Sequence, residues 1–177
     1  MNERVATRII FFIAGMVTAI WAVIVPFAKV NTGVDEAVLG SLLLCLGAGA
    51  IVAMPLTGPL TSRFGCRKVI GCAVMIVILA TPFLSVIRDP LALGLTLLIF
   101  GIGIGITDCA MNIQAIIVEK TSGKPLMSGF HGMYSFGGIA GAGLMTALLT
   151  LGLTVMLSVA ALSILVLGLL VISYRTL

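Results

Sequence analysis

Long stretches without a charged side chain dominate this sequence of 177 residues. Residues 9–28 lie uncharged between Arg8 and Lys29, and residues 37–62 are likewise free of charge. A helix needs about 20 predominantly apolar residues to cross the hydrocarbon core of a bilayer. Only 9% of the residues are charged, whereas a soluble domain usually has about 25%. The sequence therefore predicts an integral membrane protein rather than a soluble domain.

The apolar runs predict helices, because they are apolar on every face. Strands of a membrane barrel would alternate apolar and polar residues, and a helix satisfies its backbone hydrogen bonds within one segment. Residues 125–174 would form a helix of about 75 Å, which exceeds any bilayer, so we expect a turn at residues 150–154. We predict an all-α membrane domain over residues 1–177, with spans at approximately 9–28, 37–61, 69–87, 91–118, 127–149 and 153–174.

The basic residues predict the orientation of the spans. Because the first run is long enough to cross a bilayer, we expect it to be a retained helix rather than a cleaved signal peptide. The loops on the side of the N-terminus then carry eight basic residues, and the opposite side carries only Lys29 and Arg88. By the positive-inside rule, both termini are expected in the cytoplasm. The eight residues are Arg4, Arg8, Arg63, Arg67, Lys68, Lys120, Lys124 and Arg175.

The distribution of chemically reactive residues argues against several classes of function. The basic residues form no patch with interleaved aromatics, so we expect a lipid bilayer and not a nucleic acid as partner. The four cysteines contain no CxxC pair, and His131 is the only histidine, so we expect no metal site. Since there is neither a nucleophile–base pair nor a phosphate-binding loop, we expect no enzyme and no cofactor.

A stripe of small and polar residues follows one face of the expected fourth helix. Gly101, Gly105, Asp108, Asn112 and Glu119 recur at helical spacing. The two glycines allow close packing of a neighbouring helix, and ionisable residues inside a membrane usually face a bundle interior or a wet cavity. Asp108 is therefore a candidate proton carrier or hydrogen-bond partner of a polar solute, with Asn112 beside it. The alternative is that Asp108 and Asn112 bond only to each other or to a neighbouring helix.

Two further residues are weaker candidates for the solute pathway. Gln114 offers hydrogen bonds, but it lies on the face of the helix opposite to Asp108. Trp21, in the first span, either contacts the solute or packs in the usual way for a tryptophan.

The start of the expected fifth helix contains a histidine and several glycines. His131 either pairs with Glu119 across the short loop as a cytoplasmic gate, or it is an interfacial histidine with ordinary partners. Gly137 and Gly141 are expected to form a smooth face for helix packing.

The loop between the second and third spans resembles the signature of the major facilitator superfamily, which reads roughly G-x-L-x-D-R-x-G-R-K/R. The matching positions are Gly58, Ser62, Arg63, Gly65, Arg67 and Lys68. Ser62 departs from the pattern, because the family usually has an aspartate there that helps to close the cytoplasmic gate.

A second segment resembles one branch of this superfamily, which contains the bacterial inner-membrane protein YbjJ and the MosC proteins. The resemblance rests on Asp108, Asn112, Gln114, Glu119 and His131 with their neighbours. It implies a multi-pass protein of the bacterial inner membrane. The fifth span lacks the Gly-Pro pair of drug antiporters.

The resemblance implies a secondary transporter of a small polar, sugar-like or inositol-like solute, working by alternating access. Such transporters have two six-helix halves with the solute site between them. This sequence is expected to be the N-terminal half, with the C-terminal half absent. The alternatives are a truncated, non-transporting fragment, a half that needs a second chain, or a homodimer with self-complementary surfaces. A passive channel lacks support, since no ring of filter carbonyls or charges recurs.

Overall fold

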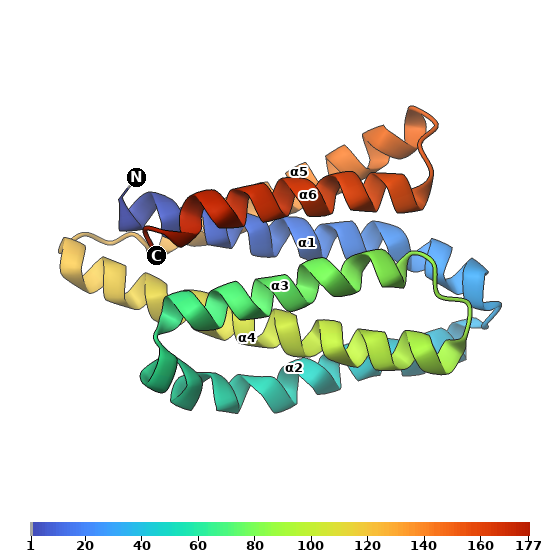
Figure 1. Cartoon of the computed structure of the whole chain (residues 1–177), viewed down its shortest axis with the longest axis horizontal. Coiled ribbons are helices and arrows are strands. Elements are labelled where there is room, and N and C mark those ends of the chain that lie inside the picture. The colour runs from blue at the N-terminus through green and yellow to red at the C-terminus, as the bar shows by residue number, and fades with distance from the viewer. Residues whose placement is uncertain (1) are drawn as a thin grey trace.

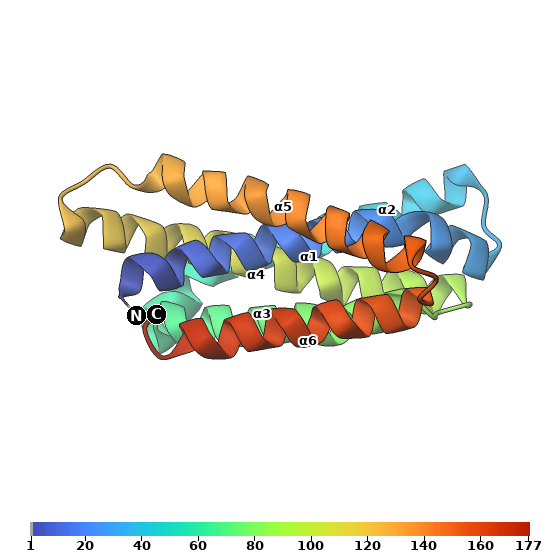
Figure 2. The same cartoon turned by 90° about the horizontal axis from the view of Figure 1, so that it is seen from above.

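The computed structural model describes residues 2–177, which form a bundle of six helices (Figure 1). Each helix is long and apolar enough to cross a membrane, so the predicted all-α fold with six transmembrane helices is confirmed. Both ends of the described chain lie at the same end of the bundle (Figures 1 and 2). The helices are α1 (Glu3–Thr32), α2 (Glu36–Phe64), α3 (Cys66–Leu84), α4 (Pro90–Ser122), α5 (Met127–Thr150) and α6 (Val155–Tyr174).

Polar caps outside the apolar runs set where the helices begin and end. At four helix starts a side-chain oxygen accepts a hydrogen bond from an amide three residues later, and the capping residues are Asn2, Asp35, Asp89 and Thr154. Gly33 and Gly123 end α1 and α4 in the left-handed conformation, with φ of 65° and 62°. As a result α1 has 30 residues and α4 has 33. Both helices therefore extend beyond a hydrocarbon core of about 30 Å.

Two crossed helix pairs form the most extensive contacts of the bundle, α1 with α5 and α2 with α4. A methyl group at Gly101 would collide with the backbone of Leu46 on α2, and one at Gly105 would come within 2.7 Å of the Ala50 Cα atom. In the other pair, the same kind of collision with the α1 backbone would occur at Gly137. Glycine is therefore required where these helix backbones touch.

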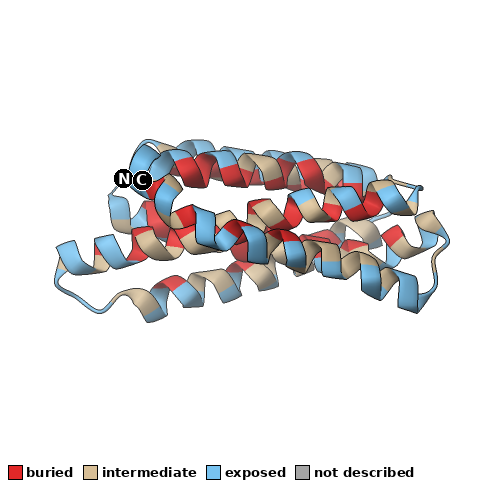
Figure 3. Ribbon diagram, turned by 90° about the horizontal axis from the view of Figure 1, so that it is seen from below, coloured by how far each residue is buried: buried red, intermediate tan, exposed pale blue. Residues whose placement is uncertain are grey.

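Helix α1 occupies the middle of the bundle, where it contacts α3, α4, α5 and α6. The buried residues form inward-facing stripes along the helices (Figure 3). Buried hydroxyl groups do not break this apolar core, because each donates a hydrogen bond to a carbonyl one turn earlier. Examples are Thr7, Thr57, Thr81 and Thr107.

Helices α2 and α5 are the least covered. Only 17% of the most apolar stretch of each is buried, against 56% in α1 and α3. Large apolar side chains stand exposed on both helices, including Ile51 on α2 and Ile139 on α5, at 71% and 72% exposure. The bundle therefore has two helices whose outer faces are available to lipid or to another protein surface.

Candidate functional site

Asp108 lies in the middle of α4 and is half-buried. Its carboxyl group lies near enough to the imidazole ring of His131 on α5 for an electrostatic interaction. The hydrogen bond recorded at Asp108 uses its backbone carbonyl, which accepts from the side chain of Asn112. The structure thus places an acidic and a basic side chain from two helices near each other, and among the described residues no ion pair joins them.

A phenylalanine from α1 completes this arrangement. The ring of Phe11 meets the His131 ring edge to face, with 5.4 Å between the centroids and 86° between the planes. Phe11 also stacks with Phe130, with 5.5 Å between the ring centroids. Because Phe11 and Phe130 are fully buried, they fix the position of the exposed His131 ring. We refer to Phe11, Asp108 and His131, which come from α1, α4 and α5, as the midbundle cluster.

Helix α4 is longer than α5, with 33 residues against 24. Helix α4 continues to Ser122 and projects past the start of α5, so the chain runs back before α5 begins at Met127 (Figure 2). Asp108 lies fourteen residues before the end of α4, and His131 lies four residues into α5. The offset between these two helix ends allows Asp108, far inside α4, to lie near His131, which is one turn from the start of α5.

Asn112 is held by its own helix. Its side-chain amide donates a hydrogen bond of 2.8 Å to the backbone carbonyl of Asp108, one turn earlier. The amide therefore does not bind the Asp108 carboxylate in this conformation. Its remaining oxygen stays available as an acceptor next to the midbundle cluster.

Glu119 caps the start of α5. Its carboxylate accepts hydrogen bonds from the backbone amides of Leu126 and Met127, at 2.6 and 2.8 Å. The alternative in which Glu119 pairs with His131 is not formed in this conformation, since the ion pair recorded within residues 2–177 joins Lys29 to Glu36. The partners of this cap are backbone amides, which have no signature in the sequence.

Trp21 and Gln114 are both buried in the structure. Trp21 is 6% exposed, and its ring lies 6.1 Å from that of Phe100 on α4. Gln114 is 8% exposed and borders a hollow of about 380 Å³ that Glu3 and Lys68 also line, at the end of the bundle with the termini. Trp21 is thus packed between α1 and α4, and Gln114 belongs to the surroundings of the α2–α3 loop.

The α2–α3 loop is tight and strongly basic. Gly65 connects the two helices with a φ of 83°, a conformation that favours glycine. Ser62, Arg63 and Lys68 are exposed around it. The guanidinium group of Arg67 lies over the ring of Tyr174, 5.4 Å from its centroid. This cation–π contact joins α3 to the end of α6.

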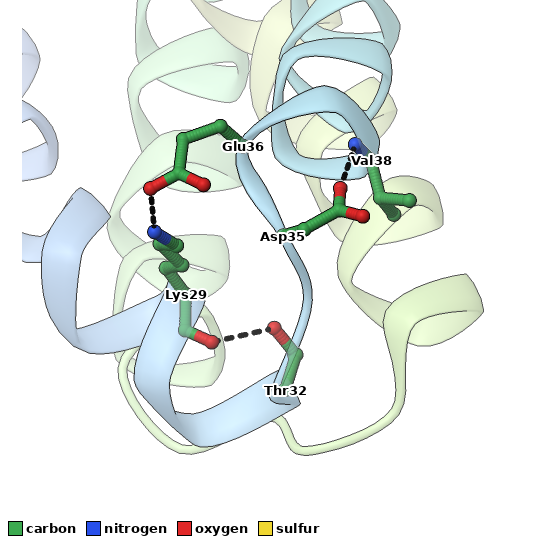
Figure 4. A network of polar contacts seen from close by, with 5 residues as sticks. All are labelled: Lys29, Thr32, Asp35, Glu36 and Val38. Carbon is green, nitrogen blue, oxygen red and sulfur yellow. Dashed lines mark hydrogen bonds and ion pairs between the residues drawn. The ribbon is translucent and has the colours of Figure 1, made fainter.

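At the opposite end of the bundle, polar contacts fasten the α1–α2 connection (Figure 4). Lys29 pairs with Glu36 across the connection, and Asp35 caps α2 through the amide of Val38. The side chain of Asn31 also donates to the carbonyl of Ser85, at 3.0 Å. These contacts tie the ends of α1, α2 and α3 together.

Metal ligands do not cluster in the described chain. Within residues 2–177, no three His, Cys, Asp or Glu side chains are close enough together to hold an ion.

The chain is similar to a known protein family and to several individual proteins. The sequence profile of the Major Facilitator Superfamily matches residues 8–177. An uncharacterized MFS-type transporter of Yersinia pestis is 49% identical over 177 residues, which is all of this chain and 46% of that protein. An uncharacterized transporter of Sinorhizobium fredii is 35% identical over 75% of this chain and 35% of its own length. The membrane protein MosC of Rhizobium meliloti is 32% identical over 74% of this chain and 32% of its own length.

The chain therefore spans about half the length, or less, of the curated relatives it matches. No solved structure matches it significantly.

Proposed function

The chain belongs to the Major Facilitator Superfamily, a family of transporters rather than enzymes, and we propose that it is the N-terminal six-helix half of a secondary active transporter. In this proposal the complete transporter moves a small polar solute by alternating access, with the solute site between two halves. The observation that carries it is the midbundle cluster. An ionisable residue inside a membrane is costly and usually marks a solute or proton pathway.

The cluster offers chemistry that suits a sugar-like or inositol-like solute. The Asp108 carboxylate supplies two acceptor oxygens for solute hydroxyl groups or takes up a proton, and the His131 ring supplies a donor. Asn112 adds an acceptor one turn along α4. A proton taken up by Asp108 would remove its negative charge, which gives a way to couple proton movement to solute release.

We propose the bacterial inner membrane as the location, with both termini in the cytoplasm. The excess of basic residues at the end of the bundle that contains the termini supports this orientation. The cytoplasmic gate loop would then contain Gly58, Ser62, Arg63, Gly65, Arg67 and Lys68. Glu119 would lie on the same side of the membrane, where it caps α5.

The experiment reconstitutes this chain in liposomes together with the second six-helix half of the Yersinia pestis relative. Uptake is measured with a panel of labelled hexoses and inositols, and proton entry is followed with an internal pH-sensitive dye. We expect uptake from the pair of halves and none from the 177-residue chain alone. Uptake by the chain alone would contradict the half-transporter, and no uptake of any solute by the pair would favour the non-transporting fragment.

Variants in the pair of halves test the cluster. Asp108→Asn is expected to lower uptake about tenfold or more, because the solute would lose a hydrogen bond to a charged group. Asp35→Asn is the matched control, because asparagine caps a helix as well as aspartate does and the residue lies outside the cluster. Equal uptake by Asp108→Asn and Asp35→Asn would remove Asp108 from the mechanism.

A further inference from the structure

Two apolar grooves run along the outer surface of α3, one on each side. The groove between α3 and α6 has a volume of about 570 Å³ and is lined by Cys72, Met75, Leu167 and Val171. The groove on the α2 and α4 side has a volume of about 340 Å³ and is lined by Leu60, Phe64 and Ile106. Cys72 and Ile76 border both grooves, so α3 forms the ridge between them.

Each groove has a basic residue on its lining, toward the end of the bundle that contains the termini. Lys68, in the first turn of α3, lines one groove, and Arg175, directly after α6, lines the other. Arg67 follows Cys66 at the start of α3 and lies over Tyr174, which also lines the α3–α6 groove. Three cations thus surround the ridge where it would meet the membrane surface.

Acidic side chains do not neutralise these cations. The ion pair recorded within residues 2–177 lies at the other end of the bundle, between Lys29 and Glu36. Glu3 borders a hollow together with Arg67 and Lys68, but it forms no ion pair with either of them in the described chain. Ser62 stands nearby where an acidic residue is usual in the loop signature, so no carboxylate comes from that position.

We propose that these grooves form a binding site for an anionic phospholipid of the membrane leaflet at this end of the bundle. The phosphate group would contact Lys68, Arg67 and Arg175, and the acyl chains would lie in the grooves beside α3. Two facts select this occupant. The groove walls are apolar and lie on helices long enough to cross a membrane, and the charges at their end are positive and form no ion pair among the described residues. Basic pockets between transmembrane helices are recognised by anionic headgroups. This site is separate from the midbundle cluster, so the proposal does not rest on the transport function.

Native mass spectrometry of the purified chain tests the proposal. The chain is incubated in detergent with equal amounts of phosphatidylglycerol and phosphatidylethanolamine, which differ in net charge. We expect phosphatidylglycerol adducts to dominate. Lys68→Gln and Arg175→Gln should each lower the ratio of phosphatidylglycerol to phosphatidylethanolamine adducts about fivefold. The reason is that each basic residue near a membrane surface adds to the attraction of an anionic lipid. Arg88→Gln removes the same charge at the other end of the bundle and should leave the ratio unchanged.

A second pair of variants distinguishes a grooved site from a bare patch of charge. Val171→Trp fills the α3–α6 groove and should lower the number of phosphatidylglycerol adducts. Ile164→Trp is the control, because it changes another exposed position of α6 that lies outside the groove lining. Circular dichroism verifies that each variant is helical. The proposal is overturned if the Lys68 and Arg175 variants keep the wild-type ratio. It is also overturned if Val171→Trp binds like Ile164→Trp, or if millimolar inorganic phosphate displaces the lipid.

Discussion

Two glycines of α5 stand in different surroundings, which makes them a matched pair at the residue scale. A methyl group at Gly137 would collide with the backbone carbonyl of Phe12 on α1, whereas nothing lies within 4 Å of the corresponding position at Gly143. Gly137→Ala is therefore expected to lower the free energy of unfolding by about 1–3 kcal/mol, because the helices must separate. Gly143→Ala should raise it by up to about 1 kcal/mol, because alanine favours the helix. Thermal unfolding in detergent checks both, and equal midpoints would contradict the close contact.

The candidate site shows what the residues could and could not predict. The polar face of α4 was visible from spacing alone, because the helical repeat places Asp108, Asn112 and Glu119 on one side. The proximity of Asp108 to His131 was not visible, since it depends on how far α4 projects past the start of α5. The burial of Trp21 against Phe100 was equally hidden, because a span that is apolar on every face does not reveal which side faces the core. The roles of these residues in transport stay predictions.

At the scale of the element, α5 starts without a side-chain cap of its own, and Glu119 from α4 takes that place. Glu119→Ala is expected to cost about 1–2 kcal/mol of stability, because two backbone amides lose their acceptor. Glu119→Gln should retain most of the stability, since an amide oxygen also accepts hydrogen bonds. Unfolding midpoints and hydrogen exchange at Leu126 and Met127 provide the measurement. Equal losses in both variants would indicate that the charge matters more than the cap.

The paired helices explain why the fold was largely predictable. Each span is apolar over a sufficient length, so the number and type of the helices follow from the cost of unpaired backbone groups in lipid. The partners of each helix do not follow from that cost. They depend on backbone contacts such as those of Gly101 and Gly105 with α2, and of Gly137 with α1. A glycine spacing indicates a packing face, but it does not identify the helix on the other side. That α1 meets α5 and α2 meets α4 therefore had to come from the structure.

At the scale of the whole molecule, the orientation in the membrane can be tested with thiol reagents. We expect a variant that keeps only Cys66, at the start of α3, to react with a membrane-impermeant maleimide in inverted vesicles and not in intact cells. Cys66 lies beside the basic α2–α3 loop, which is expected in the cytoplasm. A cysteine at position 86, in the connection between α3 and α4, should show the opposite pattern (Val86→Cys in a background without other cysteines). Reversal of the two patterns would invert the proposed topology.

The uncovered outer faces of α2 and α5 lead to a prediction about assembly. If a second half covers them, a photoreactive phospholipid should label α2, α5 and α6 in the chain alone, because all three carry exposed apolar side chains such as Ile51, Ile139 and Ile164. With the second half of the Yersinia pestis relative present, labelling of α2 and α5 should fall several-fold. Labelling of α6 should persist, because lipid is excluded only from the surfaces that the two halves bury against each other. Peptide mass spectrometry resolves the three helices. Uniform loss over all three would indicate aggregation, and unchanged labelling would mean that these faces remain in contact with lipid.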